Sequence, residues 1–251
     1  MKPETNAQNN KRLAPHTHTH KLMLSFDITG GQNISGTLPT ELSLLDTLQT
    51  ISLPHNEFTG TLPVEYARMS NLISLDLHGN KLVGTIPSEF WGSSSIFRQL
   101  DFGDNFLEGF LSTEIGRLTN LKKLDVGRNH IEGHLPTELG ELRFLTYARL
   151  DHNMFHKKIP SEMGRMTSLR ELWLQSNRLY EPIPSEIGGM RDLRAFWNCW
   201  YIFCFGTTSR LLIFCIVCHP IRGFTSVQES NQWDDPRRVV QSFESESIGS
   251  Q

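Results

Sequence analysis

Short alternations of apolar and polar residues recur along most of the chain at a nearly constant interval. From Leu72 to Asn80, for example, Leu75 and Leu77 alternate with polar residues, and Leu72 supplies a third apolar position. An alternation of this length is typical of a short β-strand that buries one face. An asparagine follows where the chain must turn inward, so the pattern predicts one strand and one turn per interval.

The interval is 24 residues with one exception. Successive asparagines are spaced by 24, 25, 24, 24 and 24 residues, and Gln32 precedes the first of them by 24 residues as a degenerate member. A fixed period in this range is the signature of stacked repeats. We therefore predict about seven repeats of 24–25 residues across residues 22–196. The repeated asparagines are Asn56, Asn80, Asn105, Asn129, Asn153 and Asn177.

The remainder of each unit predicts how the chain returns to the next strand. A buried asparagine amide can bond the backbone groups that the turn leaves free, in its own unit and in the next one, so stacked units should form an asparagine ladder. Gly84 then permits a turn with positive φ, and Pro87 stiffens the bend. Ser88 and Glu89 should open a short helical turn, with the serine as its cap.

These residues resemble the plant-type leucine-rich repeat. The segment from Leu121 to Glu138 fits its pattern, L-x-x-L-x-L-x-x-N-x-L-x-G-x-I-P-x-E, nearly throughout. The resemblance implies a right-handed α/β solenoid with a curved parallel β-sheet on the concave face and short helical or irregular turns on the convex face. It also implies binding to proteins or peptides, as in the ectodomains of receptor-like kinases and receptor-like proteins and in polygalacturonase-inhibiting proteins.

The segments outside the repeats have different compositions. Residues 1–21 are expected to form a disordered tail and contain no apolar stretch typical of a signal peptide. Within the apolar segment 197–222, residues 199–218 are about long enough to cross a bilayer. Arg210 lies in the middle, where its insertion would cost about 2.5–3.5 kcal/mol. Residues 223–251 are polar and expected to be disordered.

Three interpretations of the apolar segment stay open: a membrane span, a hydrophobic cap on the last repeat, or an unnatural tail from a mis-predicted or truncated reading frame. The membrane span is slightly favoured, and with it a membrane-associated location over a cytoplasmic one.

Charge and motif content argue against an enzyme or a nucleic-acid binder. The formal net charge is −3, which excludes a strongly basic nucleic-acid-binding protein. Residues 101–103 spell the kinase metal-binding triplet Asp-Phe-Gly, but they follow the repeat and lack the accompanying kinase motifs. The haem-like spacing in residues 215–219 and the alternating histidines of residues 16–20 are attributed to coincidence and to a solvated tail. We predict no catalytic residues, cofactor or metal site.

The variable positions of the predicted concave face are the candidate binding surface. Between the paired core residues of each strand this face carries Ser52, Asp76, Asp101, Asp125, Arg149 and Trp173. Arg149 and Trp173 depart from the aspartates and belong to the residue types enriched in interface hot spots, although tolerated surface substitution would also explain them. Flanking strand residues extend this surface: Tyr147, Asp151, His152, Arg170, Glu171 and Gln175.

Charge also divides along the predicted solenoid. Residues 24–120 carry 4 basic and 11 acidic side chains, whereas residues 121–196 carry 12 basic and 10 acidic ones. Such a gradient could orient a partner. The sequence therefore predicts a non-enzymatic protein- or peptide-binding module, the recognition part of a receptor-like membrane protein. The alternative is an intracellular scaffold or inhibitor-type repeat protein without a membrane span.

Overall fold

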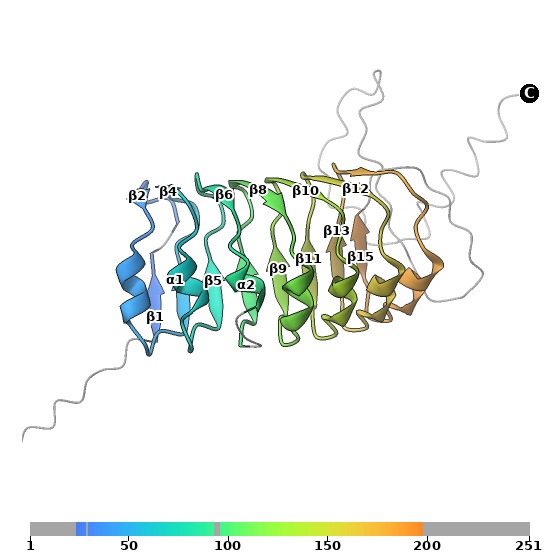
Figure 1. Ribbon diagram of the computed structural model, residues 1–251, viewed down its shortest axis with the longest axis horizontal. Helices are drawn as coiled ribbons and strands as arrows, with labels where there is room; N and C mark the ends of the chain where they lie inside the picture. The colour runs from blue at the N-terminus through green and yellow to red at the C-terminus, as the bar shows by residue number, and fades with distance from the viewer. Residues whose placement is uncertain (1–23, 29, 93–95, 198–251) are drawn as a thin grey trace, which may run out of the picture.

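Each repeat contributes one short strand to a parallel inner sheet. The computed structural model describes residues 24–28, 30–92 and 96–197, and in this part of the chain the inner sheet has eight strands in chain order. Figure 1 shows them side by side along the length of the solenoid, with the helical turns in front of them. The strands are β1 (Ser25–Asp27), β3 (Thr50–Ser52), β5 (Ser74–Asp76), β7 (Gln99–Asp101), β9 (Lys123–Asp125), β11 (Tyr147–Arg149), β13 (Glu171–Trp173) and β15 (Ala195–Trp197).

The predicted solenoid of stacked repeats is confirmed by the pairing of these strands. Leu124 lies opposite Leu100 on one side and Ala148 on the other, so each buried strand residue meets its equivalent in the next repeat. Between β5 and β7 the register advances by 25 residues, from Leu75 to Leu100, without a break in the sheet. The longer repeat therefore places its additional residue outside the inner strand.

A second set of parallel strands follows the asparagines, and the sequence analysis did not predict it. It forms a two-stranded and a five-stranded sheet along one edge of the solenoid, which is the upper edge in Figure 1. Paired residues of these strands are not equivalent positions of successive repeats, because Val83 lies opposite Phe106 and Glu108 lies opposite His130, which are fewer residues apart than one repeat. They are β2 (Ser35–Thr37), β4 (Glu57–Thr59), β6 (Val83–Thr85), β8 (Phe106–Phe110), β10 (His130–Gly133), β12 (Met154–Lys157) and β14 (Arg178–Leu179).

Short helical turns return the chain to the inner sheet, as predicted. They are η1 (Thr40–Leu44), α1 (Val64–Ala67), α2 (Glu89–Gly92), η2 (Thr113–Arg117), η3 (Thr137–Glu141), η4 (Ser161–Arg165) and η5 (Ser185–Gly189).

The helical turn expected at Ser88 and Glu89 is α2, which begins at Glu89 directly after Ser88, but a serine cap does not extend to most of the other turns. The cap position of η1, α1, η3, η4 and η5 is a proline in extended conformation and makes no side-chain hydrogen bond. In η1, η3, η4 and η5 a serine or threonine follows this proline, and Ser161 for example donates to the carboxylate of Glu162, whereas Val64 follows it in α1. In η2 the proline is replaced by Ser112, whose hydroxyl accepts a hydrogen bond from the backbone N–H of Glu114.

The buried asparagine ladder is confirmed. Asn129 donates through Nδ2 to the carbonyls of Val126 and Gly127 in its own repeat, both at 3.1 Å, and of Phe102 in the preceding repeat at 3.0 Å. Its Oδ1 accepts the backbone N–H of Leu107 at 2.9 Å. The Oδ1 of each other ladder asparagine likewise accepts a backbone N–H of the preceding repeat. Asn56, Asn80, Asn105 and Asn153 are also buried, and Asn177 is half-buried.

Among the described residues, no helix is both long and apolar enough to span a bilayer. The tails predicted at 1–21 and 223–251, and residues 198–222 of the apolar segment, lie outside the described residues.

Replacing Asn129 with alanine should lower the free energy of unfolding by about 1–3 kcal/mol, because the backbone groups that it satisfies stay buried without partners. Urea denaturation of both proteins measures this difference. Asn177→Ala is the matched control and should cost less, because that side chain is half-buried. Equal stability of the Asn129 variant and the parent would show that the asparagine ladder does not contribute to the free energy of unfolding at this position.

Replacing Lys157 with glycine should stabilise the protein by about 0.5–1 kcal/mol. Lys157 has a φ of 70°, at the position where Gly84, Gly109 and Gly133 have φ values of 78°, 85° and 89°. The left-handed conformation strains a residue with a Cβ, and glycine relieves this strain at a smaller entropic cost. Thermal unfolding should show a raised Tm for Lys157→Gly and a lowered one for His156→Gly, and the same direction in both would refute the assignment.

Candidate functional site

The register of the inner sheet aligns the last residue of every strand into a row across the concave face. Arg149 pairs with Trp173, as expected from the repeat spacing, and Trp173 pairs in turn with Trp197. On the other side Arg149 pairs with Asp125, and Asp125 with Asp101. Trp197 was absent from the predicted surface, although it lies 24 residues after Trp173 and its position in the period could have revealed it.

The tryptophans and the arginine form a stacked group. The rings of Trp173 and Trp197 are 4.9 Å apart and nearly parallel, with an interplanar angle of 20°. On the opposite side of Trp173, the guanidinium carbon of Arg149 lies 5.8 Å from the ring centroid, within cation–π range. Both faces of the Trp173 indole are therefore occupied, and a partner would meet its edge.

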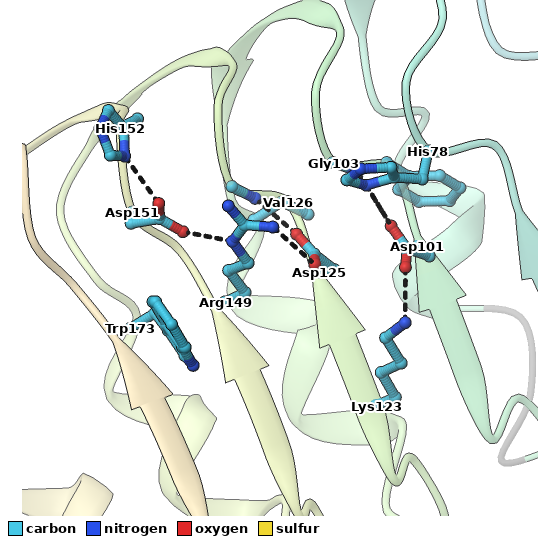
Figure 2. Close-up of polar contacts among 12 residues, drawn as sticks. His78, Asp101, Gly103, Lys123, Asp125, Val126, Arg149, Asp151, His152 and Trp173 are labelled. Atoms are coloured by element: carbon cyan, nitrogen blue, oxygen red, sulfur yellow. Dashed lines mark hydrogen bonds and ion pairs between the residues drawn. The ribbon is translucent and has the colours of Figure 1, made fainter. Parts of the chain in front are cut away.

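Buried acids hold Arg149 in this stack (Figure 2). Its Nε donates to Asp151 Oδ1 at 2.8 Å, and its Nη1 lies 3.8 Å from Asp125 Oδ2. The second oxygen of Asp151 is 2.6 Å from His152 Nδ1. Asp151 is completely buried, so it orients Arg149 and His152 and does not itself line the surface.

The other predicted surface residues differ in accessibility. Arg170 and His152 are exposed, Tyr147 and Glu171 are half-buried, and Gln175 is buried. The ammonium of Lys123 lies 5.5 Å from the centroid of the Tyr147 ring. The structure therefore brings Tyr147, Arg149 and Trp173 together on adjacent strands, while Gln175, like Asp151, lies below the surface that a partner could touch.

A second polar cluster adjoins this group, and the sequence analysis gave it little weight because aspartate is common at these positions. Asp101 Oδ2 accepts a hydrogen bond from Lys123 Nζ at 2.7 Å, and Asp101 Oδ1 lies 3.3 Å from His78 Nδ1. Asp125 Oδ1 accepts the N–H of Gly127 at 3.0 Å. The side chains of Asp101 and Asp125 are only 5% and 3% exposed.

Burial and mutual repulsion perturb the ionisation of these acids. Burial, with the neighbouring charge of Asp101, raises the pKa of Asp125 to about 7. Burial alone would also raise the pKa of Asp101, but the adjacent imidazole of His78 and the hydrogen-bonded ammonium of Lys123 lower it. The interaction with Asp101 in turn raises the pKa of His78. Negative charge is therefore accommodated at Asp101 and disfavoured at Asp125.

The raised pKa of Asp125 predicts a pH-dependent stability. A carboxyl whose pKa is higher in the folded state binds its proton more tightly there, so its contribution to stability falls as pH rises from about 4 to 7 and is constant above. Asp125→Asn removes this dependence. We expect the free energy of unfolding of the variant minus that of the parent protein to be larger at pH 8 than at pH 5, by on the order of a few kcal/mol.

Urea denaturation at the two pH values measures this change. Asp104→Asn, at an exposed acid that follows β7, is the control and should show no such change. If the variant and the parent differ in free energy of unfolding by the same amount at pH 5 and pH 8, the pKa of Asp125 is not raised in the folded protein.

Comparisons with known proteins agree with this architecture. A sequence profile of the Leucine Rich Repeat matches residues 71–93, 120–142 and 168–190. No curated protein sequence matches the chain.

Solved structures that resemble the chain include two plant receptors and one bacterial protein. The plant peptide hormone receptor RGFR1 in complex with RGF2 is 33% identical, with a TM-score of 0.63 over 66% of this chain and 27% of that one. The ectodomain of the Arabidopsis thaliana receptor kinase GASSHO1/SCHENGEN3, in complex with CASPARIAN STRIP INTEGRITY FACTOR 2, is 31% identical, with a TM-score of 0.66 over 68% and 21%.

The Leptospira interrogans LRR protein LIC12759 is 33% identical, with a TM-score of 0.56 over 68% of this chain and 42% of that protein. The chain thus spans less than half the length of each of these three proteins.

Proposed function

Because this chain belongs to the leucine-rich repeat family and its repeats are of the plant type, we propose that it is a non-enzymatic module that binds a protein or peptide on its concave face. The binding surface centres on Arg149, Trp173 and Trp197. This surface is the recognition part of a receptor-like membrane protein.

The observation that carries the proposal is the stacked row of Trp197, Trp173 and Arg149. A large aromatic side chain on the concave face of the inner sheet does not contribute to the core, yet Trp173 and Trp197 stack on each other there. The stack and the ion pair with Asp151 hold all three side chains in place before a partner arrives. A partner then loses less side-chain entropy on binding, which is how pre-organised interfaces gain affinity.

Charge supports an oriented mode of binding. The acidic first part of the solenoid, residues 24–120, and the mildly basic second part, residues 121–196, meet between β7 and β9, so a dipolar partner is favoured in one direction along the sheet. The solved plant receptors are in complex with RGF2 and CASPARIAN STRIP INTEGRITY FACTOR 2, and their likeness to this chain supports a peptide or protein as the ligand class.

The proposal is tested on a partner captured with the full chain. Trp173→Ala should weaken binding by about 2 kcal/mol or more, because it removes the centre of the stack, and Trp197→Ala should weaken it through the same platform. Asp76→Ala should cost much less. Isothermal titration calorimetry measures each affinity, and circular dichroism verifies folding.

Phe144→Ala is the matched control, because Phe144 is a 60% exposed aromatic located between η3 and β11 and not on the concave face. The concave assignment fails if the Phe144 variant loses binding while the two tryptophan variants retain it.

Subcellular fractionation of a C-terminally tagged full-length product tests the receptor role separately. Recovery in the membrane fraction after alkaline carbonate washing is the expected result. Recovery of the intact product in the soluble fraction would refute the membrane role and favour the intracellular scaffold or inhibitor-type protein, without bearing on the concave binding surface.

A further inference from the structure

Three potential metal ligands from successive repeats converge beside the stacked group. His78 follows β5, Asp101 ends β7 and Asp125 ends β9. One ligand atom from each lies within 4.8 Å of the others. Figure 2 shows the His78 ring and the Asp101 carboxylate directed toward each other, with Asp125 on the next strand.

Gly103 makes this convergence possible. A Cβ at residue 103 would lie 2.6 Å from Asp125 Oδ1 and 2.8 Å from His78 Nδ1, closer than real contacts allow. Both side chains therefore approach each other across bare backbone, which only glycine provides. The glycine of the Asp-Phe-Gly triplet thus has a local steric role.

His78 supplies an observation independent of the carboxylates. Its Nδ1 is buried and has no hydrogen-bond partner, because the 3.3 Å approach of Asp101 Oδ1 does not meet hydrogen-bond geometry. A buried polar atom without a partner costs about 1–3 kcal/mol, and native structures rarely tolerate one without a reason. The lone pair of a neutral imidazole nitrogen is a common metal ligand.

The nearby cations do not neutralise the cluster. Lys123 takes only Oδ2 of Asp101, and the short bond of Arg149 goes to Asp151. Asp125 is left with a backbone N–H and a guanidinium nitrogen at 3.8 Å. The two buried carboxyl groups thus share one close ammonium and the His78 imidazole 3.3 Å from Asp101, and negative charge at Asp125 is the least compensated, which is unfavourable for a buried group. A small dication would supply the missing positive charge where a bulky side chain has no room.

We propose that His78, Asp101 and Asp125 bind a divalent transition metal ion of the zinc or manganese type. One imidazole and two carboxylates suit these ions, and the three protein ligands leave further positions for water. The metal cross-links β5, β7 and β9 on the concave face. The proposal stands on these contacts alone and does not depend on the proposed partner binding.

Mn²⁺ titrated into chelator-treated full-length protein, followed through the electron paramagnetic resonance of the free ion, tests the site. Mn²⁺ prefers oxygen ligands, so the cysteines of residues 199–218 and the histidines of residues 16–20 interfere less than they would with Zn²⁺. We expect one bound ion per chain. His78→Ala and Asp125→Asn should each weaken binding at least tenfold, and Asp104→Asn, an exposed acid nearby, should leave it unchanged.

Lys123→Met separates a metal site from a structural ion-pair network. Removing the ammonium frees Asp101 Oδ2, so Mn²⁺ should bind several-fold more tightly even if the variant is less stable without metal. Gly103→Ala should weaken binding by forcing the ligands apart. Binding that is absent in the millimolar range, or that is unaffected by His78→Ala and Asp125→Asn in variants that fold by circular dichroism, overturns the proposal.

Discussion

Every layer of this protein depends on one interaction, the hydrogen bonding of a buried asparagine amide to the backbone of two adjacent repeats. The turn after each inner strand leaves carbonyl and N–H groups without sheet partners, and buried backbone groups must be paired. An asparagine offers two N–H donors and one acceptor oxygen in a small rigid unit, which matches that need. Asn80, for example, bonds the carbonyls of Leu53 and Leu77, each at 3.0 Å, and the N–H of Phe58 at 3.1 Å.

The ladder makes the concave face a precise surface, because it fixes the register of the strands. Once Leu124 lies opposite Leu100 and Ala148, the neighbouring outward residues must also align. Residues at the same position of successive repeats therefore form a row across the sheet. Here such a row contains the acids Asp101 and Asp125 near its middle and the stacked Trp173 and Trp197 at its C-terminal end. Arg149 connects the two groups, because it lies over the Trp173 ring and 3.8 Å from Asp125.

The features that follow the period could be predicted from the sequence. The inner strands, the helical turns and the buried asparagines each recur every 24 residues, so one repeat predicts the others. Apart from β14, the strands of the second sheet are no shorter than the inner ones, but large apolar residues in them lie exposed beside the few buried ones, as Val83 does in β6 and Phe106 does beside Leu107 in β8. Residues such as Val83 and Phe106 therefore did not indicate a strand.

The buried cluster escaped prediction for a different reason. His78, Asp101 and Asp125 occupy two different positions of the repeat, so they do not form one column of the sequence pattern. Their contact also requires the missing side chain at Gly103. The burial of Asp151 was missed similarly, because Arg149 and His152 fold over it only in three dimensions. Local pattern predicts position, whereas accessibility depends on the neighbours' side chains.

The ladder bonds also point in one direction along the chain. Each asparagine completes the repeat that precedes it, since Asn153 accepts from the N–H of Ile131 and donates to the carbonyl of Val126. A ribosome that synthesises the protein from its N-terminus therefore releases repeats that remain incomplete until the next one emerges. Repeats should therefore fold in the order in which they are synthesised, and only the newest repeat should lack the hydrogen bonds from the next asparagine. In the sequence the next position of the period after Asn177 is Tyr201, so the series of ladder asparagines ends with Asn177.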